Sequence, residues 1–167
     1  MKNLILLMPI MLFAQSCLEK DDVLPKAIPS IGNKLKFDGY YHQINNDNEI
    51  YRPLIMYCNG VLINVGGFGN SLEEMDEYIK KNYIQDAWYK NNKYKWGVFY
   101  IEDNFIRINQ LSQDYPHREF IQEGVILNDT TFKITKYSSR DRIIERDEVY
   151  HFRQFSPKPD STNVFIK

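Results

Sequence analysis

The residues of this chain best suited to metal or nucleophilic chemistry are three histidines and a cysteine. His42, His117 and His151 lie far apart, and none stands at a zinc-ligand spacing from another histidine or a cysteine. Cys58 could act as a nucleophile if the fold brought a histidine beside it. It ends an apolar run, however, and a free cysteine in such a place usually packs as a small buried side chain. We therefore expect Cys58 to be half-buried and inert.

Three further segments have part of the pattern of a known site. Residues 117–119 (HRE) have the His-x-Glu half of a zinc deaminase signature, but the Pro-Cys-x-x-Cys half does not occur. Residues 66–71 (GGFGNS) precede a predicted helix like a phosphate-binding loop but lack the P-loop lysine, so we expect a flexible strand-to-helix turn. The charge-alternating run 140–148 indicates a solvated hairpin end, with a partner-binding loop as the alternative. We predict no catalytic residue, no metal, no cofactor and no enzyme activity.

The first sixteen residues have the features of a secretory signal. Lys2 gives a positive start, and the apolar run over residues 4–13 is shorter than the roughly 20 residues that span a bilayer. Ala14 and Ser16 are small residues placed for cleavage before Cys17. The predicted organisation is a signal peptide over residues 1–16, a tether over 17–33 that holds two prolines and several charges, and a folded domain over 34–167.

Residues 14–17 (AQSC) resemble the lipobox of bacterial lipoproteins, in the loose form common in Bacteroidetes. The resemblance implies a diacylglycerol on the Cys17 thiol and a fatty acid such as palmitate on its amine, and two or more chains anchor a protein stably. Residues 20–22 (KDD) are similar to the export signal of surface lipoproteins in that group. The expected location is therefore the outer membrane, lipid-anchored and facing the cell surface. A solvated acidic linker is the alternative for residues 20–22.

The composition of the mature chain predicts one self-sufficient domain. Lys2 is the only charge in the signal, so the remaining 151 residues hold 20 Lys and Arg against 22 Asp and Glu. This length can bury a core without disulfides, and a lipidated Cys17 leaves Cys58 without a partner for an intramolecular one. A near-neutral chain with no basic stripe argues against nucleic acid as a partner.

The pattern from residue 34 onward is mainly that of short strands separated by turns. We expect strands near 35–44, 50–58, 61–66, 95–102, 105–111, 119–127, 131–138 and 148–155. Asn59-Gly60 predicts a two-residue hairpin loop, and the short connections at 103–104 and 128–129 make the neighbouring strands antiparallel. One helix is expected near residues 71–84, against an end or side of the sheet. Ser71 and Glu74 form its capping box, and apolar residues then recur at helical spacing.

Eight antiparallel strands with one apolar face favour a closed barrel, with a sandwich or a strongly curved sheet as alternatives. The alternation predicts inward aromatic side chains that either line a ligand cavity or fill the core. The inward aromatics Trp96, Tyr100, Phe132, Tyr150 and Phe152 are candidate ligand-binding residues, and Tyr41 is a further candidate.

The chain also resembles small lipocalin-like lipoproteins of Bacteroidetes. The resemblance lies in residues 37–41 (FDGYY), 96–101 (WGVFYI), 123–128 (EGVILN) and 158–163 (KPDSTN). Tyr41 occupies the position where lipocalins have a tryptophan. It implies an eight-stranded antiparallel lipocalin-like barrel over residues 34–167. The helix falls within the chain rather than after the last strand, which departs from lipocalins.

Two tripeptides, 129–131 and 160–162, match the Asp-Ser/Thr pattern that Bacteroidetes O-glycosylate, which makes Thr130 and Ser161 candidate glycosylation sites. Both fall at predicted turns, where Asp-Thr and Asp-Ser are favoured in any case.

Two functions follow as expectations. The first is a lipid-anchored cell-envelope protein that binds a small apolar or amphipathic ligand inside the barrel. The alternative is a surface-exposed accessory protein with a filled core, which contacts another surface protein through segments such as 85–94 and 138–148.

Overall fold

The computed structural model describes residues 26–28, 34–44, 50–113, 119–139 and 142–166. The predicted signal peptide, Cys17, residues 20–22 and His117 lie outside these described residues.

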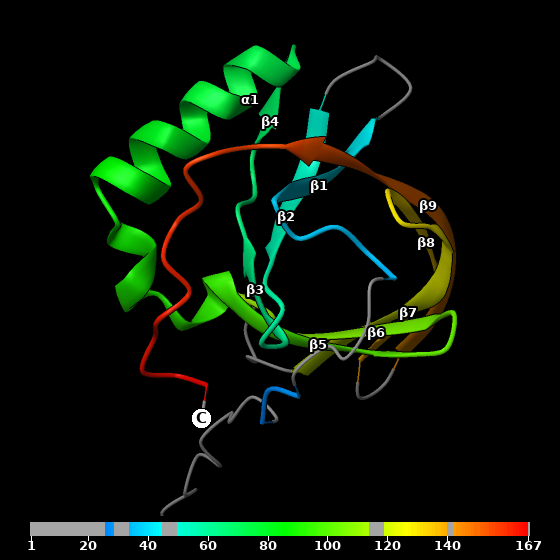
Figure 1. Cartoon of the computed structure of the whole chain (residues 1–167). Coiled ribbons are helices and arrows are strands. Elements are labelled where there is room, and N and C mark those ends of the chain that lie inside the picture. The colour runs from blue at the N-terminus through cyan, green and yellow to red at the C-terminus, as the bar shows by residue number, and fades with distance from the viewer. Residues whose placement is uncertain (1–25, 29–33, 45–49, 114–118, 140–141, 167) are drawn as a thin grey trace, which may run out of the picture.

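Eight strands form a closed antiparallel barrel, which confirms the expected fold (Figure 1). Around the ring the strands follow the order β1-β9-β8-β7-β6-β5-β3-β2, and β1 pairs with β2 to close it. A ninth strand, β4, is a two-residue addition to β2. The strand bounds are β1 Gly39–Ile44, β2 Ile50–Met56, β3 Val61–Asn64, β4 Phe68–Gly69, β5 Trp96–Glu102, β6 Phe105–Leu111, β7 Glu119–Asn128, β8 Thr131–Ser139 and β9 Arg142–Gln154.

The barrel is closed at one end, its base, by the chain that leads into β1. Leu35 is buried among the interior side chains, and Phe37 packs against them. The backbone N–H of Lys36 donates to the Asp129 carbonyl over 2.9 Å, which fixes this segment across the β7–β8 turn. In Figure 1 this segment crosses the inside of the ring. Residues 35–38 are therefore a base plug rather than the start of the first strand, which corrects the predicted bounds.

Gly39 lets β1 approach β9 closely beside this plug. A Cβ at this position would lie 1.9 Å from the Arg153 carbonyl oxygen, so only glycine fits. At the same end of the barrel, Gly60 has a φ of +82° and closes the predicted β2–β3 hairpin. The loop holds residues 58–60 between Tyr57 and Val61, one residue more than expected.

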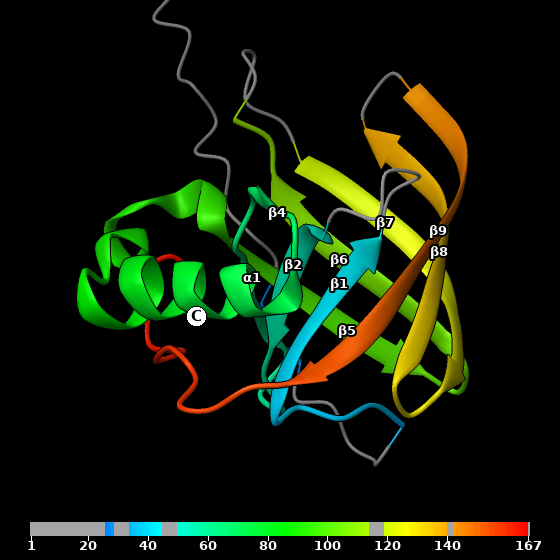
Figure 2. The same cartoon turned by 90° about the horizontal axis from the view of Figure 1, so that it is seen from above.

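The helix α1 (Leu72–Ile79) continues through a π-helical turn, η1 (Lys80–Gln85), and lies on the side of the barrel (Figures 1 and 2). Its start confirms the capping box, because Ser71 Oγ accepts from the backbone N–H of Glu74. The Glu74 carboxylate reaches back to the backbone N–H of Asn70, one residue earlier than expected. Two 3₁₀ turns, η2 (Trp88–Asn91) and η3 (Lys93–Lys95), lead back into the barrel.

Two separate apolar clusters hold the molecule together. One fills the barrel interior, and the other lies between the outer face of the barrel and the helix. Met75 and Ile79 of α1 and Trp96 of β5 belong to the outer cluster, and Phe155 brings the C-terminal segment into it. Arg153 and the hydroxyl of Tyr40 both contact the Asp76 carboxylate, which ties α1 to β9 and β1. The helix is thus an integral second layer.

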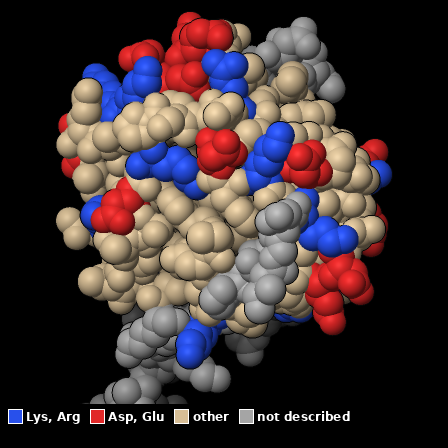
Figure 3. All heavy atoms as spheres, in the orientation of Figure 1, with Lys and Arg blue, Asp and Glu red and all other residues tan. Residues whose placement is uncertain are grey.

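The charged run lies at the end of the β8–β9 hairpin, as expected, but β9 begins at Arg142 rather than near residue 148. Residues 142–148 form the first half of β9, and β8 continues to Ser139 opposite them. Most side chains of residues 142–148 are exposed, so their alternating charges are in contact with water. On the face in Figure 3, Lys and Arg lie interspersed with Asp and Glu.

Candidate functional site

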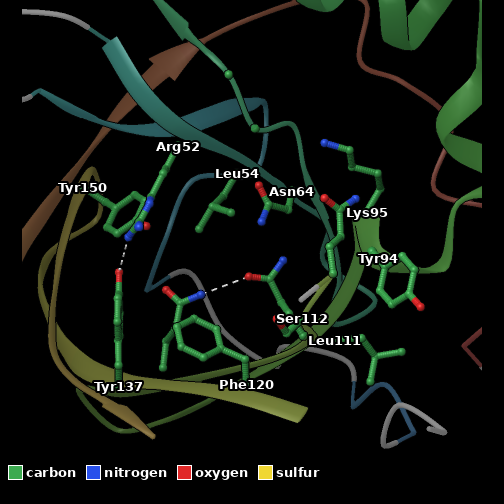
Figure 4. A pocket seen from close by; sticks show the side chains of 15 residues that line it. Arg52, Leu54, Asn64, Tyr94, Lys95, Leu111, Ser112, Phe120, Tyr137 and Tyr150 are labelled. Atoms are coloured by element: carbon green, nitrogen blue, oxygen red, sulfur yellow. Dashed lines mark hydrogen bonds between the residues drawn. The ribbon is translucent and has the colours of Figure 1, made fainter. Parts of the chain in front are cut away.

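A cavity of about 470 Å³ opens at the end of the barrel opposite the base plug, which we call the mouth. Its position follows from the strand directions, because β3 and β6 end there and β5 and β7 begin there. Figure 4 shows Arg52, Tyr137 and Tyr150 on one side of the cavity and Tyr94 and Lys95 on the other. Its lining residues are Arg52, Leu54, Asn64, Gly66, Gly67, Tyr94, Lys95, Gln110, Leu111, Ser112, Gln113, Phe120, Gln122, Tyr137 and Tyr150.

Below the cavity, side chains fill the barrel. Phe132 and Tyr150 stack with ring centroids 4.7 Å apart, and Tyr41 lies 5.1 Å from Phe132. Phe99 and Ile108 are equally buried. The Tyr41 hydroxyl shares its one proton between the carbonyl oxygens of Lys36 (3.0 Å) and Asp129 (3.1 Å), so its polar group has partners at the base. Packed side chains therefore fill the interior of the barrel at its base, and the cavity occupies the interior at its mouth.

A partly buried carboxylate, that of Glu148, organises one wall of the mouth. Glu148 Oε2 lies 3.4 Å from Arg52 Nη1 and accepts hydrogen bonds from Gln43 Nε2 (2.7 Å) and from the Tyr137 hydroxyl. Arg146 approaches the other carboxylate oxygen at 3.7 Å. Burial, together with the Glu148 carboxylate, raises the pKa of Tyr137 well above its ordinary value, so this phenol remains a donor.

Arg52 reaches this wall through an irregularity in β2. Two residues, Arg52 and Pro53, stand opposite His42, because the β1–β2 register shifts between Tyr41 and Gln43. Arg52 has a φ of +46°, which costs of the order of 1–3 kcal/mol for a residue that is not glycine. Bulges of this kind redirect side chains next to binding sites.

Two buried amides on neighbouring strands form the floor of the mouth. Gln122 Nε2 donates to Gln110 Oε1 over 2.9 Å, one of the dashed lines in Figure 4. The two side chains are only 5% and 3% exposed. Gln110 Nε2 and Gln122 Oε1 have no hydrogen-bond partner among the described residues. One NH2 group and one carbonyl oxygen are therefore left without a hydrogen bond beside a cavity, which costs about 1–3 kcal/mol for each group.

Lys95 supplies a cation on the opposite side of the mouth. Its Nζ donates to the Val65 carbonyl over 3.0 Å and lies 5.5 Å from the centre of the Trp88 ring. Both of these contacts are with neutral groups. Burial lowers the pKa of Lys95, since the ammonium is partly removed from water.

The structure separates the six predicted ligand-binding aromatics into three groups. Tyr150 lines the cavity, whereas Tyr41, Phe132 and Phe152 belong to the filled base below it. Trp96 and Tyr100 were placed wrongly, because the inward positions of β5 are Gly97, Phe99 and Ile101. Trp96 instead packs under the helix in the outer cluster, and Tyr100 contacts the exposed Phe105 on the outside.

Cys58 is exposed in the β2–β3 turn, so its predicted packing role is wrong. His42 is 4% exposed and its ring lies 6.3 Å from that of His151. Thr130, in the β7–β8 turn, is half-buried and donates to Asn128 Oδ1, and Ser161 is half-buried in the C-terminal segment. Among the described residues, no three His, Cys, Asp or Glu side chains are grouped so that they could hold a metal ion.

The residues that sequence reasoning missed are the polar ones of the mouth: Arg52, Glu148, Gln110, Gln122, Tyr137 and Lys95. A signal existed for Gln110, since Ile106 and Ile108 alternate inward on β6 and Gln110 is the next inward position. Arg52 and Glu148 are distant in the sequence and meet only through barrel closure.

The geometry defines a lipocalin-like barrel: eight antiparallel strands, a plugged base and an open polar mouth. No protein-family model, no curated protein and no solved structure matches this chain. Within the described part of the chain, no helix has both the length and the apolar character that crossing a membrane requires.

Proposed function

We propose that this protein binds a small amphipathic molecule in the mouth of its barrel. The observation that carries the proposal is the cavity of about 470 Å³, a volume within the usual range of small-molecule sites. Leu54, Phe120 and Tyr150 offer apolar surface there, while the amides and Lys95 offer polar contacts. A purely apolar ligand fits this lining poorly, because it would leave the buried amide groups without partners.

The proposal includes the cell address expected from the sequence. Lipid on Cys17 would hold the protein on the outer membrane, and residues 20–22 would send it to the cell surface, as in the Bacteroidetes lipoproteins that it resembles. Attachment of this kind would keep the barrel where small molecules arrive from outside.

A panel of small amphipathic molecules tests the binding function directly. The panel contains N-acetyl-leucine, N-acetyl-leucinamide, leucinol and 4-methylpentanoate, and ligand-detected NMR reports which of them bind. Asn64 is the last residue of β3, pairs with Leu54 and lines the cavity. The larger side chain of Asn64→Trp should therefore fill the mouth and weaken ligand binding at least about tenfold. Val125→Trp, on the exposed outer face of β7, is the matched control and should leave binding unchanged.

Circular dichroism should show that both variants keep the fold. Failure of every panel member to bind the wild type, or equal binding by the wild type and Asn64→Trp, would reject the mouth as a ligand site.

The second candidate function is contact with another surface protein. It is favoured by an exposed apolar group on the outside of β6 and β7, where Phe105 pairs with Val125 and Leu127 is 55% exposed. This surface differs from the segments 85–94 and 138–148 named from the sequence. Those segments hold the 3₁₀ turns and parts of β8 and β9.

A further inference from the structure

The contacts of the mouth also indicate which class of molecule it would bind. This inference rests on the proposed function, because it concerns the same cavity. Three features carry it: a cation that faces only neutral partners, a donor and acceptor pair left over between two buried amides, and apolar surface between them.

The first feature is the difference between the two cations of the mouth. Arg52 is engaged with the Glu148 carboxylate, whose charge it offsets. Lys95 contacts the Val65 carbonyl and the Trp88 ring, and no acidic side chain among the described residues pairs with it. An anionic ligand is stabilised more by a half-buried ammonium that has no counter-charge than by one that is already paired. The reason is that hydrogen bonds between charged groups are stronger than those between neutral groups.

The second feature is the amide pair of the floor. Gln110 and Gln122 use one donor and one acceptor on each other. Whichever way the two amides are turned, a pair joined in this manner leaves one NH2 group and one carbonyl oxygen without a partner. A ligand amide carries the matching acceptor and donor, whereas a hydrocarbon or a lone carboxylate lacks the donor. The pair therefore favours a ligand that contains an amide.

The third feature is the space between these groups. Lys95 and the amide floor belong to one cavity, and Leu54, Phe120 and Tyr150 give that cavity its apolar lining. Glu148 disfavours a second anion on the Arg52 side, so a ligand carboxylate is placed on the Lys95 side.

We propose that the mouth recognises a small amido acid, with its carboxylate at Lys95, its amide on the Gln110–Gln122 pair and an apolar side chain against Phe120 and Tyr150. N-acylated amino acids with an apolar side chain are the simplest members of this class. Neutral polar ligands, which would use the amides alone, are the alternative that the experiment distinguishes.

The first arm of the test removes one charge from the ligand and one from the protein. Isothermal titration calorimetry compares N-acetyl-leucine with N-acetyl-leucinamide, which differ in the carboxylate. The wild type should bind the acid about tenfold more tightly, the value of one charge-assisted contact. Lys95→Met should bind the two ligands within twofold of each other. Lys93→Met is the matched control, since Lys93 lies in the same turn over the Tyr94 ring, and it should retain the preference.

The second arm removes the amide in the same way. 4-Methylpentanoate is N-acetyl-leucine without its acetamido group, and the wild type should bind it about tenfold more weakly. The double variant Gln110→Leu, Gln122→Leu should reduce this difference to less than twofold. Replacing both partners of a buried hydrogen bond by apolar groups is close to neutral for stability, so the variant is expected to fold.

The outcomes separate the inference from the function on which it rests. Equal affinity of the wild type for the acid and its amide, or an unchanged preference in Lys95→Met, would overturn the carboxylate assignment while binding in the mouth stands. An acetamido preference that survives in the double variant would overturn the role of the amide pair. If none of these ligands binds, the proposed function itself fails.

Discussion

Arg52 Nη1 lies 3.4 Å from Glu148 Oε2 at the mouth of the barrel, although 96 residues separate the two in the sequence. The contact joins β2 to β9, two strands that are not neighbours in the ring, because β1 stands between them. The Arg52 guanidinium donates to Tyr137 of β8 as well, over 2.9 Å. One ion pair thus spans the interior at the mouth and fixes the wall of the cavity.

Removing the charge of Glu148 should destabilise the protein. In Glu148→Gln the guanidinium of Arg52 would face a neutral amide in a partly buried place, and we expect a loss of about 1–3 kcal/mol. Chemical denaturation measures the change in the free energy of unfolding. Asp147→Asn is the matched control, because Asp147 directly precedes Glu148, is 80% exposed and pairs with Lys133 on the surface. Equal losses in the two variants would contradict the structural role of the ion pair.

The buried His42 should make the fold sensitive to acid. Burial, with the charges of His151 and Arg153, lowers the pKa of His42 to about 4, whereas Asp76 acts in the opposite direction. An unfolded histidine titrates near pH 6.5, so between pH 6.5 and 4 the unfolded chain binds more protons. The free energy of unfolding therefore falls as the pH drops through this window, by up to about 3 kcal/mol from this residue.

His42→Phe should flatten this part of the stability curve, measured by urea unfolding at several pH values. His151→Gln should flatten it only slightly, since burial is the larger cause of the pKa shift. An identical slope in the wild type and in His42→Phe would show that other groups set the acid limit.

The N-terminus of α1 should depend on the side chain of Ser71. Its Oγ accepts the backbone N–H of Glu74 over 3.1 Å, and loss of such a cap costs about 1 kcal/mol. Ser71→Ala should lower the melting temperature, and Ser71→Asp should largely retain it because the carboxylate can accept the same bond. A melting temperature of Ser71→Ala equal to that of the wild type would mean that helix packing alone sets the start of α1.

Features that depend on nearby residues were predictable from the sequence. The Ser71–Glu74 capping box and the hairpin at Gly60 were read correctly because their partners lie within a few residues. Trp96 was misplaced because β5 is apolar on both faces, one toward the barrel interior and one toward the helix. Alternation separates two faces but does not say which is inside when a second layer buries the other. The polar mouth depends on barrel closure, which no local pattern encodes.

The predicted lipid anchor has its own test. Cys17→Ser should move the protein from the membrane fraction into the soluble fraction, because no other acyl chain is expected on it. Replacement of residues 20–22 by alanines should leave membrane attachment intact but protect the protein from protease added to whole cells. Membrane association that persists in Cys17→Ser would reject the anchor, and equal protease sensitivity would reduce residues 20–22 to a linker.

The most direct test of binding in the mouth is to map where a ligand contacts the protein. Backbone and side-chain amide signals of isotope-labelled protein would be followed while N-acetyl-leucine is added. We predict the largest shifts at Gln110, Gln122 and Lys95, with little change at Phe132 in the filled base. Shifts confined to Phe105, Val125 and Leu127 on the outer face, with none in the mouth, would contradict a ligand-binding barrel and favour the protein-contact surface instead.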